Sequence, residues 1–349
     1  WAQAHTIPFE TFDIAMGVSI VLTEEAIFDK LVTRKRGGYC YEVNALIHFA
    51  LQAMGFKTYL ALARLTDKDE KILPESVHMV VIVELEKMWL VDVGWENGFA
   101  EPFVVDGTTF YHKGRKLYEF SLERKPLEFF EERNHYHQTS YHSVFVDEPT
   151  CSLLTTDGCA WIGGSRKESD EEYRSELKNV FGLELQINRP VKIENETFIL
   201  HSPRNQTDWN HYHQIRIEQI HERYCPELVY DYNDPEEKEN HPLVFRKKDS
   251  DSILGVMRID FLPDNEASFR WIAIDRNHQR KGLGTEMLRL AESYVRTHKV
   301  VRIRIPATTL SLSFARHMGF SEAPWALMPK EDCMIGVVKE LQPSLSCKK

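Results

Sequence analysis

The feature that most constrains the fold is a pair of glycines set directly before a cysteine and a segment with helical spacing. Residues 36–44 read Arg-Gly-Gly-Tyr-Cys-Tyr-Glu-Val-Asn. The glycines predict a tight backbone, and apolar residues recur at helical spacing from residue 43 to 54, before Gly55. The sequence therefore places Cys40 at the start of a helix over residues 41–54. There the helix dipole and a neighbouring imidazolium would favour the thiolate.

Two downstream residues are suited to activate this cysteine. His78 opens a strand-like segment over 78–85, and Asp92 lies near the end of the next one, over 87–93. A histidine can take the thiol proton, and a carboxylate can orient and stabilise the imidazole. His78 and Asp92 share a face of a hairpin only if the loop near Glu86 has an odd number of residues, or if there is a bulge. Taken alone, Cys40 would be read as a small core residue.

Length and patterning predict two domains. The chain has 349 residues, which is enough for two or three domains. The first part reads as a helical start followed by β-rich segments up to about residue 145 and a helix over 169–181. After Arg189-Pro190, strands and then alternating helices and strands indicate an α/β sandwich with a mixed sheet. We place the domains at residues 1–188 and 189–349.

Composition argues against several classes of protein. The net charge of −10 offers no general basic face for nucleic acid, and no apolar run is long enough for a membrane span. Six scattered cysteines lack C-x-x-C spacing, which fits free thiols in the cytoplasm. Two groups of histidines lie close together in the sequence, His135, His137 and His142 in one and His211 and His213 in the other. No carboxylate or cysteine completes a recognisable ligand set with them, so we expect no metal. The acidic stretch 228–241 reads as a solvated linker.

The cysteine stretch is part of a longer pattern. Upstream lies Ile7-Pro8-Phe9-Glu10, and Asp92 stands in Val91-Asp92-Val93-Gly94-Trp95. Over about residues 1–187 this pattern resembles the arylamine N-acetyltransferase family. The resemblance implies a helical segment with an antiparallel β-barrel or sheet, and a papain-like triad of Cys40, His78 and Asp92. It also implies ping-pong transfer, in which acetyl-CoA acylates the cysteine, CoA leaves, and an arylamine or hydrazine attacks the thioester.

The same resemblance implies roles for five further residues. Glu10 and Arg36 would form an ion pair buried behind the cysteine loop, and an exposed pair is the alternative. Phe9 and Trp95 would line the acceptor pocket, with plain core packing as the alternative. Trp95 stands where the family usually has phenylalanine. Asn44 would support the loop rather than take part in the chemistry.

A second glycine-rich pattern, Gln-Arg-Lys-Gly-Leu-Gly at residues 279–284, lies between a predicted strand over 267–274 and a predicted helix over 286–298. Backbone N–H groups at such a turn suit a phosphate group. Together with Ser-Phe-Ala-Arg-His-Met-Gly-Phe at 313–320, the pattern resembles the GNAT acyl-CoA N-acyltransferase superfamily over about residues 192–345. The resemblance implies that the pyrophosphate of acetyl-CoA binds to Gln279, Arg280, Lys281, Gly282, Leu283, Gly284 and Thr285.

Both resemblances have departures. The first family usually has asparagine where Thr11 stands, and its leading helical segment would precede Trp1, so we expect that initial residues have been cut away. The second family often has a tyrosine general acid where Ala315 stands. Its common asparagine is also missing, and Thr308 and Thr309 lie nearby instead.

We therefore predict a cytoplasmic, bifunctional acyltransferase that moves acetyl groups from acetyl-CoA to small amines. The second domain would transfer directly to an unknown primary amine, with Glu266 as candidate general base; a surface loop charge is the alternative for this residue. One rival function is an amide synthase or acyl-CoA hydrolase that uses Cys40. Another is a C-terminal domain that binds CoA only to regulate the first, which Ala315 favours. The pattern carries no signal for an oligomeric state.

Overall fold

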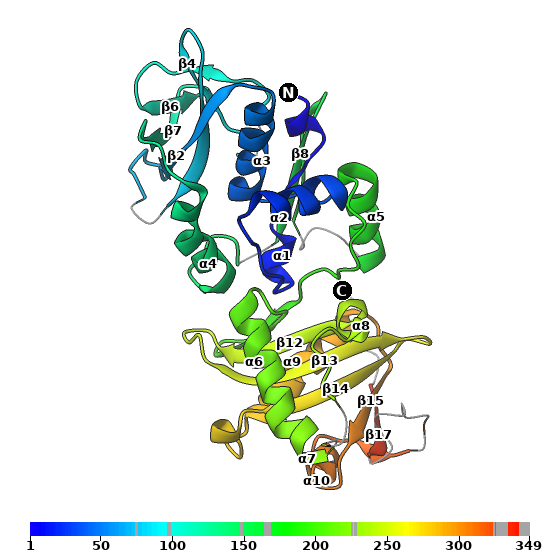
Figure 1. The fold of residues 1–349 in the computed structure, drawn as a ribbon. Coiled ribbons are helices and arrows are strands. Elements are labelled where there is room, and N and C mark those ends of the chain that lie inside the picture. Colours follow the sequence, from blue (N-terminus) through cyan, green and yellow to red (C-terminus); the bar gives the residue numbers. More distant parts are fainter. Residues whose placement is uncertain are drawn as a thin grey trace, which may run out of the picture. The chain divides into compact units, whose positions relative to one another are not determined.

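A computed structural model describes residues 1–73, 76–95, 99–146, 149–163, 169–224, 226, 229–323, 325 and 334–341. The chain divides into a first unit, residues 1–185 with 204–206, and a second unit, residues 186–203 with 207–349. Figure 1 labels many of the helices and strands of both units. No helix in the described ranges is long and apolar enough to span a membrane. Cys40, Cys151 and Cys159 are free thiols, whereas Cys225, Cys333 and Cys347 lie outside the described residues.

Short elements at the start of the first unit lead into the cysteine helix. Thr23 caps α2 by accepting a hydrogen bond from the Ala26 N–H. The cysteine helix α3 begins at Cys40 itself, and Gly55 follows it with a positive φ. The bounds are η1 (Gln3–His5), β1 (Phe9–Glu10), α1 (Phe12–Ala15), α2 (Glu24–Phe28), the π-helical η2 (Asp29–Thr33) and α3 (Cys40–Ala53).

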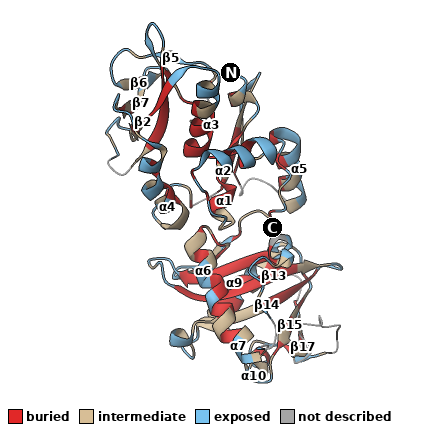
Figure 2. Ribbon diagram, viewed as in Figure 1, coloured by how far each residue is buried: buried red, intermediate tan, exposed pale blue. Residues whose placement is uncertain are grey.

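The first unit contains an antiparallel sheet of six strands in the order β5-β4-β3-β2-β7-β6. Its strands are β2 (Lys57–Leu65), β3 (His78–Glu84), β4 (Met88–Val91), β5 (Phe103–Val104), β6 (Thr109–His112) and β7 (Arg115–Phe120). Apolar residues of α3 and of β2 and β3 share one core, so the helix covers one face of this sheet (Figure 2). An aromatic core around Tyr118 and Phe110 fills the other face. A smaller sheet has the strand order β1-β8-β9, with β8 (Thr150–Thr155) between β1 and β9 (Gly158–Gly163).

Three helical segments complete the first unit. They are η3 (Leu127–Phe130), α4 (Glu131–Thr139) and α5 (Asp170–Phe181). The predicted helix over 169–181 is confirmed, because Ser169 caps α5 through its side chain and Gly182 ends it in the left-handed conformation.

The second unit is a mixed sheet of eight strands in the order β10-β11-β12-β13-β14-β15-β17-β16. Only β14 and β15 pair in parallel among the described strands; the other pairs are antiparallel. Core residues of α9 pack on one face and those of α6 on the other, which confirms the predicted α/β sandwich. The strands are β10 (Lys192–Glu194), β11 (Phe198–His201), β12 (His241–Lys247), β13 (Ile253–Leu262), β14 (Glu266–Ile274), β15 (Arg302–Ala307), β16 (Ser321–Glu322) and β17 (Ile335–Glu340). The helices are α6 (Gln206–Arg216), η5 (Ile217–His221), α7 (Glu222–Tyr224), α8 (Pro235–Glu239), η6 (Arg276–His278), α9 (Leu283–Thr297) and α10 (Leu312–His317).

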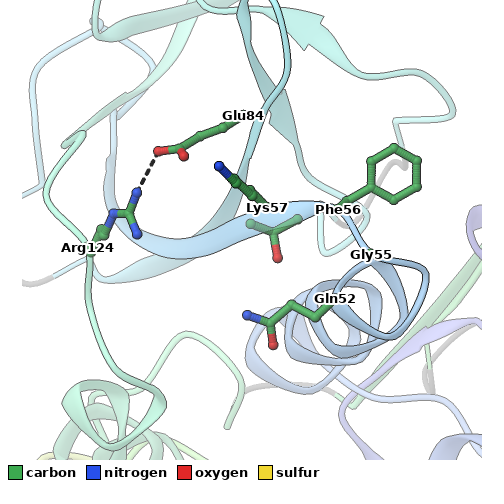
Figure 3. Close-up of a pocket in the computed structure, with 7 residues that line it drawn as sticks. Gln52, Gly55, Phe56, Lys57, Glu84 and Arg124 are labelled. Carbon is green, nitrogen blue, oxygen red and sulfur yellow. Dashed lines mark hydrogen bonds and ion pairs between the residues drawn. The ribbon is translucent and has the colours of Figure 1, made fainter.

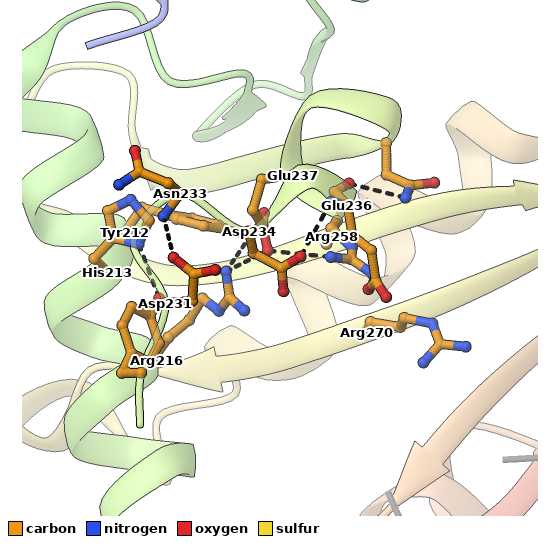
Figure 4. Close-up of polar contacts among 12 residues, drawn as sticks. Tyr212, His213, Arg216, Asp231, Asn233, Asp234, Glu236, Glu237, Arg258 and Arg270 are labelled. Atoms are coloured by element: carbon orange, nitrogen blue, oxygen red, sulfur yellow. Dashed lines mark hydrogen bonds and ion pairs between the residues drawn. The ribbon is translucent and has the colours of Figure 1, made fainter. Parts of the chain in front are cut away.

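The prediction of a solvated linker over 228–241 is wrong for the described part of this stretch. The short helix α8 lies inside it, and β12 begins at its end, at His241. Glu237 of α8 is only 6% exposed, and its carboxylate binds Arg216 and Arg258 (Figure 4). Buried guanidinium groups need such a partner. Glu237 therefore belongs to the core of the second unit rather than to the solvent.

Candidate active sites

The hairpin of β3 and β4 places His78 and Asp92 on one face. Glu84 pairs with Met88 and Val81 with Val91, so residues 85–87 form a loop of three residues. This confirms the predicted odd-numbered loop, because even position sums keep residues 78 and 92 on the same side. His78 Nε2 lies 2.9 Å from Asp92 Oδ2. Both side chains are buried, and so is Cys40.

His78 interacts with Asp92 and also with Cys40, since both residues contribute to its pKa. Burial alone would lower the pKa of His78. The charge of Asp92 and the hydrogen bonds to Asp92 and Cys40 outweigh burial and raise this pKa to about 10. Burial also opposes the Asp92 carboxylate, but His78 and further hydrogen bonds hold the Asp92 pKa below its usual value. The raised pKa therefore favours the imidazolium form of His78 at neutral pH.

Three hydrogen-bond donors besides His78 hold the Asp92 carboxylate. Asn44 Nδ2 donates to Asp92 Oδ1 over 2.9 Å, and the Gly94 N–H donates to the same oxygen over 3.1 Å. The Tyr118 hydroxyl donates to Asp92 Oδ2 over 3.1 Å. Asn44 thus fixes the triad carboxylate from α3, which is more specific than the predicted support of a loop. Sequence reasoning missed Tyr118, which lies on β7 and has no local pattern to mark it.

Two glycines are required because neighbouring groups approach them closely. A Cβ atom on Gly94 would lie 2.8 Å from the Cys40 Cα and 2.7 Å from Asn44 Nδ2. A Cβ atom on Gly38 would lie 2.8 Å from the Glu42 side chain. Neither glycine has a positive φ, so space rather than backbone conformation excludes a side chain.

A buried cluster of five charged residues lies behind the cysteine loop. Arg36 binds Glu10 over 2.6 Å and Asp13 over 2.8 Å. Lys30 binds Asp13 over 2.8 Å and Glu42 over 2.7 Å. Burial raises the pKa of Glu42 to about 7 even though Lys30 opposes this shift. The ion pair of Glu10 and Arg36 therefore belongs to a larger network that sequence reasoning missed.

The two predicted pocket aromatics lie in different environments. Phe9 is buried in the same apolar cluster as Cys40. The half-buried Trp95 meets the His78 ring edge-on with centroids 5.8 Å apart, and it stacks on Phe99 at the same distance. Trp95 therefore contacts His78 directly, whereas Phe9 contributes to the core.

An open cavity lies at the other end of α3 (Figure 3). The helix has 14 residues, so this end is about 20 Å from Cys40. An ion pair between Arg124 and Glu84 spans 2.7 Å at its edge. None of the sequence-predicted site residues lines the cavity, which is formed by Gln52, Gly55, Phe56, Lys57, Thr58, Glu84 and Arg124.

In the second unit, the predicted pyrophosphate loop leads into α9. Leu283, Gly284 and Thr285 form the first turn of this helix, and Gly282 caps it with a φ of 77°. Arg280 and Lys281 are exposed. Gln279 donates to the carbonyl of Ile274 and to the Gln219 side chain, so it anchors the loop. N–H groups in the first turn of a helix have no intrahelical partner and attract anions.

The strand before this loop separates from its parallel neighbour. Within the described strands, β14 pairs with β15 only from Glu266 to Ser268, opposite Arg302 to Arg304. Beyond these residues the two strands continue unpaired toward their carboxyl ends, where α/β sheets bind ligands. The 279–285 loop begins after the end of β14. The 279–285 loop therefore follows the carboxyl end of β14, which is the end where β14 and β15 are no longer paired.

Glu266 is neither a surface loop charge nor a free carboxylate. It is buried at the start of β14, where Arg302 binds it over 2.8 Å and Arg304 binds its other oxygen. Guanidinium groups therefore engage both of its carboxylate oxygens. Across the described part of the chain, no group of three or more His, Cys, Asp or Glu side chains is arranged to hold a metal ion.

Comparisons with known proteins divide the chain in the same way. A family model described as N-acetyltransferase matches residues 1–113 and 103–190, and a model of the acetyltransferase (GNAT) family matches residues 207–320. Arylamine N-acetyltransferase 2 of Mus musculus is 30% identical over 246 residues, and that of Rattus norvegicus is 31% identical. Each alignment covers 53% of this chain and 85% of the relative. The solved arylamine N-acetyltransferase from Salmonella typhimurium is 22% identical, with a TM-score of 0.49 over 53% of this chain and 82% of its own.

Proposed function

The chain belongs to the arylamine N-acetyltransferase family, and from this premise we propose that its first unit transfers acetyl groups by a ping-pong route through Cys40. Both matching families are acetyltransferases, so the chain is an acyltransferase with acetyl-CoA as its donor. The observation that carries the proposal is the buried row of Cys40, His78 and Asp92, with the pKa of His78 raised to about 10.

In the first half-reaction, the Cys40 thiolate attacks the thioester carbonyl of acetyl-CoA. Backbone N–H groups at the start of α3 are suited to hold the oxyanion that forms. The intermediate collapses, the bond between the carbonyl carbon and the CoA sulfur breaks, and His78 gives its proton to the departing sulfur. The products are acetyl-Cys40 and CoA.

In the second half-reaction, the amine nitrogen attacks the acetyl carbon of acetyl-Cys40. His78, now neutral, takes the proton that the nitrogen loses, and Asp92 stabilises the imidazolium that results. The bond between carbon and the cysteine sulfur breaks and restores the thiolate. Trp95 lies against His78, so an aromatic acceptor would stack at this position, which favours an arylamine or arylhydrazine.

The test is intact-protein mass spectrometry after mixing with acetyl-CoA in the absence of an acceptor. We expect an acetyl adduct on the wild-type chain that an arylamine removes, and no adduct on the Cys40→Ala variant. Cys159→Ala is the matched control, because Cys159 is an exposed thiol of the same unit; it should behave as wild type. An equal adduct on Cys40→Ala would overturn the assignment. CoA release that an arylamine does not accelerate would favour a hydrolase or an amide synthase.

For the second unit we propose direct transfer of an acetyl group from acetyl-CoA to a primary amine. Its support is the match to the GNAT family, the helix start at 279–285 and the parting of β14 and β15. A regulatory CoA-binding domain is the second candidate, because Ala315 cannot act as an acid. The full-length Cys40→Ala variant separates the two candidates. Acetylation of any primary amine supports transfer, and CoA binding without turnover supports regulation.

A further inference from the structure

The charged cluster behind the cysteine loop is one continuous chain of hydrogen bonds that runs from the backbone of α1 toward the start of α3. The Phe12 N–H, at the first residue of α1, donates to Glu10 over 2.8 Å. Glu10 also accepts from Arg36 over 2.6 Å. Asp13 then joins Arg36 to Lys30, with 2.8 Å to each of them. Every member of this chain is held by charge-assisted contacts, which are shorter and stronger than neutral ones.

Glu42 is the last carboxylate of this chain and the one on the cysteine helix. One of its oxygens accepts from Lys30 over 2.7 Å, and the other accepts the Tyr39 N–H over 3.2 Å. In return, the Tyr39 carbonyl accepts the Glu42 N–H over 3.0 Å. Such a reciprocal pair fixes the first turn of a helix, and Cys40 directly follows Tyr39. Glu42 therefore ties the backbone beside Cys40 to Lys30 of η2.

The surroundings of Glu42 require a charged carboxylate with two accepting oxygens. The residue is only 2% exposed, and a Cβ atom on Gly38 would lie 2.8 Å from one of its carboxylate oxygens. There is thus no room for a second position of this side chain. An amide has a single accepting oxygen, and its NH₂ group would face one of the two donors. A protonated carboxyl group has the same defect, because its O–H is a donor.

The charges around Glu42 do not balance, since three carboxylates share two cations. Burial raises the pKa of Glu42 to about 7; Lys30 opposes this shift, and the charges of Glu10 and Asp13 add to it. The charged and titratable groups around Glu42 are Lys30 of η2, Asp13 of α1, Glu10 of β1, Arg36 before the glycine pair, and Tyr39 and Cys40 at the start of α3. Glu42 is therefore the carboxylate on α3 that can take up a proton near neutral pH.

We propose that Glu42 is a positioning residue for Cys40, whose carboxylate keeps the cysteine in its reactive place by accepting the Lys30 ammonium and the Tyr39 N–H together. Loss of the Glu42 charge then slows the acetylation of Cys40. This inference rests on the proposed ping-pong route. Glu42 forms no bond to acetyl-CoA or to the amine, and only a proton moves between its carboxylate and the solvent.

The test is single-turnover acetylation of Cys40, followed by mass spectrometry between about pH 5.5 and about pH 8.5. At the upper pH, Glu42→Gln should react about ten-fold more slowly than wild type, the loss expected for a hydrogen bond to a charged group. The ratio of the two rates should approach one as the pH falls, because wild-type Glu42 then takes up a proton. The titrations of Cys40 and His78 occur in both proteins and cancel in the ratio. Glu25→Gln is the matched control, because Glu25 is an exposed carboxylate in the first turn of α2.

Urea unfolding of the same samples separates positioning from a merely structural role. The pKa of Glu42 is about 7 in the fold and 4.5 ordinarily, so the folded chain binds a proton that the unfolded chain does not bind between these values. The stability of wild type relative to Glu42→Gln should therefore rise as the pH falls from about 7 to about 4.5. Over the same range its advantage in rate should disappear. Rate and stability that change in the same direction would assign Glu42 to the fold alone.

A rate ratio that is the same at every pH, or a Glu42→Gln variant as fast as wild type at the upper pH, would overturn the proposal. If Glu42→Gln does not fold, the double variant Lys30→Met with Glu42→Met takes its place, because exchanging a buried ion pair for apolar side chains is often neutral for stability. It should show the same slow acetylation. If the wild type takes up no acetyl group, the proposed route fails, and alkylation of Cys40 by iodoacetamide, measured on its peptide, decides the inference separately. The same pH-dependent ratio would support the positioning role, and equal alkylation would refute it.

Discussion

Replacing Gly94 by alanine tests how closely the segment after Asp92 packs on Cys40, the proposed nucleophile. The φ of Gly94 is not in the left-handed region, so alanine adds no backbone strain. The whole effect comes from the new methyl group, which would lie 2.7 Å from Asn44 Nδ2, 2.8 Å from the Cys40 Cα and 3.1 Å from the Cys40 Cβ. The first two distances are shorter than a Cβ atom tolerates, so α3 and the segment that carries Gly94 must move apart.

The loss of stability and of rate depends on the positions of Cys40 and Asn44, which the new methyl group displaces. Overpacking of this kind lowers the free energy of unfolding by about 1–3 kcal/mol. Asn44 also holds the Asp92 carboxylate over 2.9 Å, so its displacement misaligns the carboxylate and the cysteine together. A shift of about 1 Å in a catalytic group can lower a rate about 100-fold. We therefore expect the rate of Cys40 acetylation to fall far more than stability does.

The assay is single-turnover acetylation of Cys40 by mass spectrometry, together with urea unfolding of the same sample. Gly107→Ala is the control, because Gly107 has a φ of 92° and a Cβ atom added there would meet no described atom within 4 Å. This control should lose stability through backbone strain and acetylate at the wild-type rate. The reasoning is refuted if Gly94→Ala acetylates as fast as wild type at a temperature where both are folded.

Three further predictions concern buried polar groups. Tyr118→Phe removes a donor to Asp92 and should slow Cys40 acetylation about five-fold, the loss expected for one hydrogen bond; an unchanged single-turnover rate would contradict this. Because the pKa of His78 is raised to about 10, the stability from its charge is fully present below about pH 6.5 and is lost as pH rises through about 10. The unfolding free energies of wild type and His78→Gln should therefore converge as the pH rises from about 6.5 to about 10. A difference that stays constant over this pH range would argue against a raised pKa of His78. Glu237→Ala leaves the buried Arg216 guanidinium without its carboxylate, whereas Arg258 keeps Asp260 and Glu236, and it should lower the unfolding free energy by about 3–5 kcal/mol in calorimetry.

Local sequence patterns predicted the parts of the first site that depend on short-range structure. The helix that starts at Cys40 followed from apolar spacing and from the glycine that ends it. The shared face of His78 and Asp92 followed from the parity of a hairpin, which only the intervening residues determine. Tyr118 could not be predicted in this way. It reaches Asp92 because β7 pairs with β2, and nothing near residue 118 encodes that pairing.

The acidic stretch shows how a local reading fails when the partner is distant in sequence. A run of acidic residues with proline is usually solvated, and this expectation led to the prediction of a linker. In the fold, Glu237 lies beside Arg216 of α6 and Arg258 of β13, which neutralise it and bury it. Those arginines gave no signal by themselves. Only the packing of α6 on the sheet explains why charged residues occur in buried positions there.

Buried charge has a different consequence in each unit. Behind Cys40, three carboxylates face two cations, and Glu42 also accepts the Tyr39 N–H at the start of α3. The proposed covalent route needs a nucleophile that keeps one position through two half-reactions, and this network fixes the backbone that carries Cys40. In the second unit, Glu237 of α8 binds Arg216 of α6 and Arg258 of β13. There the buried charges join two helices to the sheet rather than position a nucleophile.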